Sequence, residues 1–311
     1  MPRPSPRLLV TAAHTRYSAS QPAAATIAIA TIGGASHPRR PGRPSLDAAV
    51  SPMPRLGGRA GSVRYGWHYV SMTAVSLGPL WHHLAAWADR QGQPPSHLLI
   101  LGTGLLAAAV VASRRAWPVA RTVVTIAHEG GHALAAVATG RRLHGVRVLH
   151  TSAGVTVTAG SPSGPGIILT ALAGYLAAPL LGLGGAALLA TGHLMAVLVL
   201  SLAGLAGLAF AIRNAYGLLA VVVTGAVIVA VLWQRSAVAA AALGYAMTWL
   251  LLFGGVRPVV ELQRDRRRRR GPSNDADQLA RLTGLPGGFW TGVFFLVAVG
   301  ALALGGWLMV G

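Results

Sequence analysis

The stretch Leu194–Trp233, LMAVLVLSLAGLAGLAFAIRNAYGLLAVVVTGAVIVAVLW, holds a single charged residue, Arg213. A membrane-spanning helix needs about 20 predominantly apolar residues. The stretch supplies two such runs, divided only by Arg213-Asn214. Helices of soluble proteins carry a polar face opposite their apolar stripe, and neither run has one. This part of the chain therefore predicts an integral membrane protein.

The rest of the chain repeats the pattern. Of its 311 residues 53% are hydrophobic and only 11% are charged, against roughly a quarter in ordinary soluble proteins. We expect an all-α integral membrane protein with about seven transmembrane helices. The predicted spans are Leu98–Ser113, Trp117–Thr139, Gly166–Ala190, Leu194–Ile212, Ala215–Trp233, Ser236–Gly254 and Phe289–Val310.

The net charge of +19 would be typical of a nucleic-acid-binding protein. Here most of the arginines lie in the N-terminal tail and in loops between apolar runs, and no polar folded body carries a basic face. No nucleic-acid partner is therefore expected. Cysteine is absent, which excludes disulfides and thiolate metal ligands.

The distribution of arginines predicts an orientation in the plasma membrane. With seven spans, Arg114, Arg115 and Arg235 would lie on one side. The other side would carry the basic tail together with Arg141, Arg142, Arg147, Arg213, Arg257, Arg264 and the run 266–270. Because positive loops face the cytoplasm, the N-terminus is expected inside and the C-terminus outside.

Three regions are expected along the chain. Residues 1–65 are rich in Pro, Ser, Ala, Gly and Arg and cannot bury enough apolar surface to fold alone. They are either a disordered tail or an over-extended gene start, with Met53 and Met72 as plausible true starts. Residues 66–97 form a juxtamembrane segment, weakly amphipathic over 72–88. Residues 98–311 form the multi-pass membrane domain.

Residues 143–160 differ from the apolar runs. Val146 and Val148 alternate with polar neighbours, as do Val155 and Val157, and Thr151-Ser-Ala-Gly154 separates the pairs. This pattern predicts a small β-hairpin. An edge strand of such a hairpin could bind an extended peptide by strand addition.

The sequence His128-Glu129-Gly130-Gly131-His132 lies inside one predicted span. On a helix, His128 and His132 share a face and can hold one zinc ion, and Glu129 beside them can act on a water at the metal. The alternative is a structural polar cluster. Ionisable groups in a span are costly, so three within five residues favour a metal site. Gly130 and Gly131 would let neighbouring helices approach closely.

Catalytic zinc normally has three protein ligands and one open position. The acidic residues after Glu129 are Glu261, Asp265, Asp275 and Asp277. Glu261 and Asp265 sit among arginines and are expected to be solvated or ion-paired. Asp275 is favoured over Asp277 as the third ligand, although residues 273–277 could simply cap a short helix over 276–284. The weaker candidates are His144, His150 and His193.

These residues resemble the site-2 protease family of intramembrane zinc metalloproteases, most closely bacterial members with a reduced core. The matching features within residues 98–310 are the HEGGH helix, Thr139-Gly140-Arg141 with the hairpin after it, Ala173-Gly174-Tyr175, Arg213-Asn214-Ala-Tyr-Gly217 and the block 275–286. The resemblance implies that His128 and His132 bind zinc, that Glu129 is the catalytic base, and that an aspartate near the C-terminus completes the site.

One motif of that family is absent in its usual form, the Asn-Pro-rich loop leading into Leu-Asp-Gly. Asn214 is a candidate for the substrate-orienting asparagine of that loop, or else a polar residue of a helix turn. The hypothesis is thus a Zn²⁺-dependent intramembrane endopeptidase that cleaves membrane-spanning segments of protein substrates within the lipid bilayer. The alternatives are a catalytically inactive relative and a metal-binding or transport scaffold.

Overall fold

The computed structural model describes residues 95–149, 153–268 and 274–311. The predictions for residues 1–65 and for 72–88 fall outside these residues. The elements are α2 (His97–Ala112), α3 (Trp117–Ala138), β1 (Arg142–Val148), β2 (Gly154–Ala159), α4 (Pro165–Ala190), α5 (Leu194–Ala211), α6 (Ala215–Trp233), α7 (Ala237–Arg267), α8 (Asp275–Thr283) and α9 (Gly287–Val310). The prediction of a helical membrane protein with a small hairpin after the HEGGH helix is confirmed.

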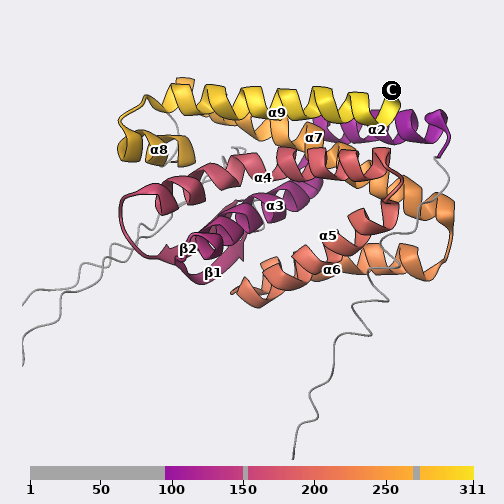
Figure 1. Ribbon diagram of the computed structural model, residues 1–311, viewed down its shortest axis with the longest axis horizontal. Coiled ribbons are helices and arrows are strands. Elements are labelled where there is room, and N and C mark those ends of the chain that lie inside the picture. Colours follow the sequence, from indigo (N-terminus) through magenta and orange to yellow (C-terminus); the bar gives the residue numbers. More distant parts are fainter. Residues whose placement is uncertain (1–94, 150–152, 269–273) are drawn as a thin grey trace, which may run out of the picture.

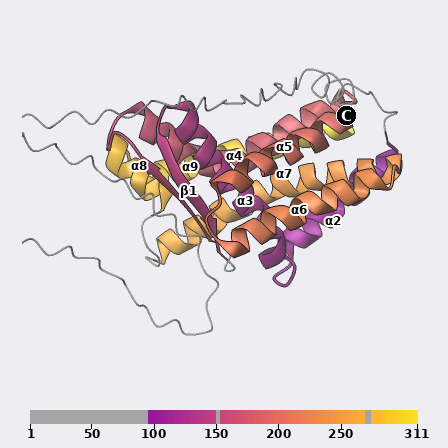
Figure 2. The ribbon, with the colours of Figure 1, turned by 90° about the horizontal axis from the view of Figure 1, so that it is seen from below.

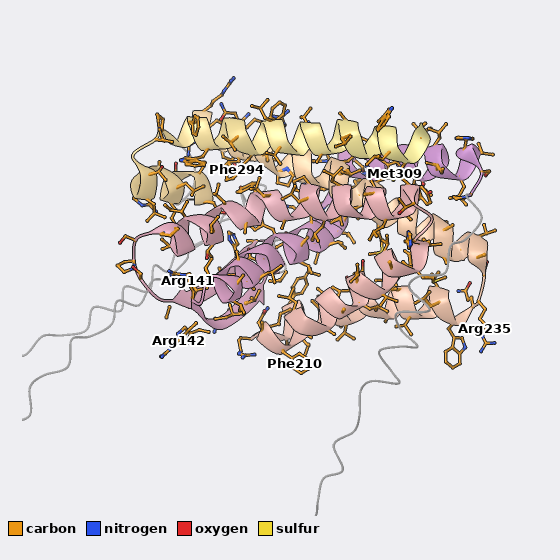
Figure 3. The ribbon with its side chains drawn as sticks, in the orientation of Figure 1. Arg141, Arg142, Phe210, Arg235, Phe294 and Met309 are labelled. Atoms are coloured by element: carbon orange, nitrogen blue, oxygen red, sulfur yellow. The ribbon has the colours of Figure 1, made fainter. Side chains whose placement is uncertain are left out.

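The long helices lie side by side, with the hairpin and α8 at one end of the bundle and the C-terminus at the other (Figure 1). Helix α4 packs against α3, α7 and α9. Half of the apolar span of α4 is buried inside the protein, whereas only 17% of the span of α5 and 17% of the span of α6 are buried. Helix α4 is therefore the central helix. Phe210 on α5 is 83% exposed and points away from the bundle (Figure 3), as expected of a side chain that faces lipid.

The predicted number of seven spans is not confirmed. Helices α4, α5, α6, α7 and α9 are each long and apolar enough to cross a membrane, and α2 with α3 adds a sixth passage only if the bent pair is one span. The two helices meet at a bend of 102°. Helix α2 has 16 residues and rises only about 24 Å, short of the bilayer core of about 30 Å.

The packing of α2 also fits a single bent passage. Ile100 near its start shares a buried apolar cluster with Leu189, Tyr245 and Met309, and Figure 1 shows α2 beside the C-terminus. Seven alternating passes would put the start of the first helix and the end of the last one at opposite ends of the bundle. Here both lie at the same end.

The bend between α2 and α3 places Arg114 and Arg115 differently from the prediction. At this bend the Arg257 guanidinium of α7 donates to the Val111 carbonyl, and the Trp117 indole N–H donates to Glu261 (3.0 Å). The bend therefore lies beside the C-terminal half of α7. Arg235 precedes the other end of α7, opposite Arg141 and Arg142 of the hairpin (Figure 3). The two arginines of the bend are thus not grouped with Arg235.

The hairpin pairs β1 and β2 in antiparallel register, from Arg142 opposite Ala159 to Val148 opposite Gly154. The outer edge of β1 is covered by the connection between α5 and α6. Arg213 N–H donates to the Val146 carbonyl (2.9 Å). The Asn214 side chain donates to the Val148 carbonyl (2.7 Å) and accepts from the Val148 N–H (3.2 Å). Within the described residues, β2 forms no backbone hydrogen bond to any element except β1.

Candidate metal centre

Helix α3 presents three ionisable side chains on one turn. His132 and Glu129 are fully buried, and the Nε2 atoms of His128 and His132 lie 3.2 Å apart. His132 Nδ1 is 2.6 Å from the Thr170 carbonyl of α4. A carbonyl only accepts, so Nδ1 carries the proton in this contact and Nε2 keeps its lone pair. The orientation and tautomer of His132 are thereby set by α4.

Asp275, the first residue of α8, completes the cluster. Its Oδ2 atom lies 3.4 Å from His128 Nε2 and 3.3 Å from His132 Nε2, and the residue is fully buried. The Asn274 side chain accepts from the Asp277 N–H (3.0 Å) and caps α8. Burial acts to raise the pKa of the Asp275 carboxyl, whereas the His132 and His128 rings, when they carry a positive charge, lower that pKa below its ordinary value.

The arrangement of these three side chains fits a metal ion. Their ligand atoms all lie within 4.8 Å of one another, and no other such group occurs in the described part of the chain. Both Asp275 oxygens are buried without a hydrogen-bond donor. Buried polar atoms are normally satisfied, and a cation between the carboxylate and two imidazole lone pairs would satisfy all three. Two nitrogens and one oxygen are a usual ligand set for zinc.

Small and aromatic residues of α4 pack against the rings of the two histidines. Gly174 has no side chain, and a Cβ there would overlap the Nε2 atoms of both His132 and His128. The Tyr175 ring packs edge-on against His128, with ring centroids 4.9 Å apart. Gly131 of α3 likewise lets α3 approach α4 closely, since a Cβ there would overlap Ala177. No comparably close contact exists at Gly130.

Strand β2 covers the Glu129 carboxylate. The Thr156 hydroxyl donates to Glu129 Oε2 (2.5 Å), and Thr156 is itself fully buried. At Gly154 any Cβ would overlap the Glu129 carboxylate, so only glycine allows the strand to lie this close. Glu129 Oε1 is buried and has no hydrogen-bond partner. One carboxylate oxygen is thus held by the strand and the other is left without a donor.

The comparisons with known proteins identify the family. A family model described as Peptidase M50B-like matches residues 101–305. The chain belongs to this family. The match confirms the resemblance to the site-2 proteases and implies a multi-pass membrane metalloprotease in general terms. No curated protein and no solved structure was found to match.

The other predicted ligand candidates of this M50B-like chain lie elsewhere. Glu261 contacts the Arg121 and Arg257 guanidinium groups at 3.3 and 3.0 Å, so it is ion-paired as predicted. Asp277 pairs with Arg266 of α7. The cluster of three, His128, His132 and Asp275, includes neither His144, which is exposed, nor His193, which contacts Thr191 at 3.0 Å. His150 lies outside the described residues.

Some residues of the site were not predicted from the sequence. The sequence predicts no role for Thr156 or Thr170, and for Asn214 it predicts either a substrate-orienting residue or a residue of a helix turn. In the structure the Asn214 amide is bound to β1 on both sides. Gly174 stands out in the sequence only as part of the Ala173-Gly174-Tyr175 block that resembles the family. Thr156 follows Gly154 by two positions on a strand of alternating pattern. Nothing in that local pattern indicates that its side chain contacts the distant helix α3.

Proposed function

We propose that this chain is a zinc-dependent intramembrane endopeptidase, with His128, His132 and Asp275 as zinc ligands and Glu129 as the general base. The observation that carries the proposal is the convergence of three ligand atoms within 4.8 Å beside a buried glutamate, in a member of a metalloprotease family. Zinc held in this way supplies Lewis acidity, which polarises a peptide carbonyl and makes water more acidic.

The residues of the chain have separate tasks in this proposal. Glu129 takes a proton from the attacking water and passes it to the nitrogen of the leaving amine. Its Oε1 atom has no partner and is available for that proton, while Thr156 holds Oε2. The Thr170 carbonyl fixes the His132 ring, so that Nε2 faces the metal position.

The substrate is proposed to be a membrane-spanning segment that is locally unwound and pairs with the hairpin. Arg213 and Asn214 occupy the outer edge of β1, so β2 offers the edge for strand addition. The side of β2 that carries Gly154 and Thr156 contacts Glu129. A peptide extended along β2 would therefore lie next to the catalytic base.

The test of this proposal combines metal analysis and cleavage. The purified wild-type protein is expected to contain one zinc per chain and to cut a peptide that contains a membrane-spanning segment. His128→Ala is expected to lose both properties. Zinc without cleavage would favour the inactive relative or the metal-binding scaffold, and a protein free of zinc would favour a polar cluster without metal.

Thr156→Val is expected to lower kcat by about 10- to 100-fold with KM and zinc content unchanged. Valine keeps the shape of the side chain but removes the hydrogen bond to the carboxylate, and a hydrogen bond to a charged group contributes about 1.5–3 kcal/mol. Thr156→Ser keeps the hydroxyl and should restore most of kcat. Thr158→Val, on the same face of β2, serves as the control, because Thr158 contacts Arg141 (3.4 Å). A wild-type kcat in Thr156→Val would contradict a role for Thr156, and so would an equally low kcat in Thr156→Ser and Thr158→Val.

The end of the bundle that carries the hairpin and α8 is proposed to face the cytoplasm. Arg141, Arg142, Arg147, Arg213, Arg264, Arg266, Arg267 and Arg268 belong to that end, and arginine-rich loops stay inside. A reporter fused after Arg268 should therefore read as cytoplasmic, and one fused after Gly311 as external. Paired reporters that are active on opposite sides of the membrane measure this. The reverse pattern would invert the orientation and place the metal centre near the outer face.

A further inference from the structure

A groove of about 410 Å³ runs between the C-terminal half of α7 and the start of α9, apart from the metal centre. Its lining changes in character along its length. Arg264, Arg267 and Gly288 line the end nearest the connection between α7 and α9, and Val260 and Phe295, which lie further along the two helices, line the other end. The groove is thus cationic at the membrane boundary and apolar toward the membrane interior.

The two arginines of the groove have no counter-charge among the residues that the structure describes. Both are exposed, and neither forms an ion pair or a side-chain hydrogen bond with any described residue. Their neighbour Arg266 differs, since it is paired with Asp277. Arg264 and Arg267 are three positions apart on α7, so they lie on the same face of the helix. The mouth of the groove therefore presents two adjacent positive charges that no described residue of the chain neutralises.

The floor of the groove is open. Gly292 and Gly288 of α9 line it, and a Cβ at either position would meet no atom within 4 Å. The space above these glycines can take a hydrocarbon chain lying along α9 beside Phe295, which is 42% exposed.

We propose that this groove binds one anionic phospholipid, with its phosphate headgroup on Arg264 and Arg267 and an acyl chain over Gly292. The order of charges and apolar surface along the groove matches the order of headgroup and tail in such a lipid. A cationic pair at the membrane boundary attracts anionic headgroups. The proposal does not depend on peptidase activity.

The full chain, solubilised from vesicles of equimolar phosphatidylcholine and phosphatidylglycerol, tests the proposal. Native mass spectrometry counts the lipids that remain bound. We expect one retained phosphatidylglycerol, which excess inorganic phosphate does not displace. Arg264→Gln with Arg267→Gln should weaken this binding by about 10- to 30-fold, the loss expected for two interfacial arginines. Gly292→Leu should abolish it by filling the groove.

Matched controls separate the groove from general effects of charge and size. Gly300→Leu is also on α9, where a Cβ would meet nothing, and Arg114→Gln with Arg115→Gln removes two exposed arginines elsewhere. Both controls should retain the lipid. Equal retention of the two phospholipids by the wild type, displacement by phosphate, or unchanged binding in either groove variant would overturn the proposal.

Discussion

Glu129→Gln is expected to lower the rate of peptide cleavage by about 10²–10⁴-fold, the usual contribution of a general base, while zinc stays bound. Glutamine keeps the size of the side chain and can still accept from the Thr156 hydroxyl, but it cannot take a proton from water. Steady-state cleavage of a peptide that contains a membrane-spanning segment, with zinc analysis of the same preparation, measures both quantities.

Two results would contradict the proposal that Glu129 is the general base. Cleavage at the wild-type rate by Glu129→Gln would show that another group moves the proton. Loss of zinc from the variant would mean that Glu129 holds the metal centre together instead of acting on water. Glu261→Gln is the control, because it makes the same change at a glutamate that pairs with Arg121 and Arg257 away from the metal ligands.

Asp275→Ala is expected to remove zinc and activity together. Loss of an outer partner of a metal ligand already lowers metal affinity by about 10- to 100-fold, so the loss of a ligand should cost more. The substitution also leaves the two histidine Nε2 atoms, which lie 3.2 Å apart, without the carboxylate that α8 supplies. Titration of the metal-free protein with zinc, followed by competition with a chelator, gives the change in affinity.

Two neighbouring aspartates serve as controls for Asp275. Asp265→Ala should retain full zinc, because Asp265 lies on α7 outside the cluster of three. Asp277→Ala should lower activity only slightly, because its pair with Arg266 is partly exposed and such pairs contribute about 0–1 kcal/mol. Full zinc in Asp275→Ala with loss in Asp277→Ala would move the ligand by two residues.

Most helices could be predicted because the length of an apolar run in the sequence gives the length of the helix that it forms. The ends of α5 and α6 agree with the predicted spans to within one residue. The prediction for α7 stopped at Gly254, yet the helix continues to Arg267, because a helix does not end where its residues become polar. The sequence predicts two separate spans at α2 and α3, and the structure does not confirm this number, because the two helices meet at a bend of 102°. Hydropathy measures apolar length and carries no information about the angle between two helices.

The site was predictable where its chemistry is local in the sequence. The spacing of His128, Glu129 and His132 within one helical turn is such a signal, and the scarcity of acidic residues narrowed the third ligand to a few positions. Thr156 and Gly174 could not be predicted in this way. Their roles arise only from the packing of β2 and α4 against α3, which no short pattern encodes.

The distance along the chain between the histidines and Asp275 has a consequence for biosynthesis. Helices α4, α5, α6 and α7 lie between them in sequence, so a ribosome must make all four after α3 before the aspartate exists. On the proposed chemistry, a partly synthesised chain holds two ligands and no working peptidase. Hydrolytic capacity then arises only after α8 has been made and has docked, which protects the nascent chain and its neighbours at the insertion machinery from premature cutting.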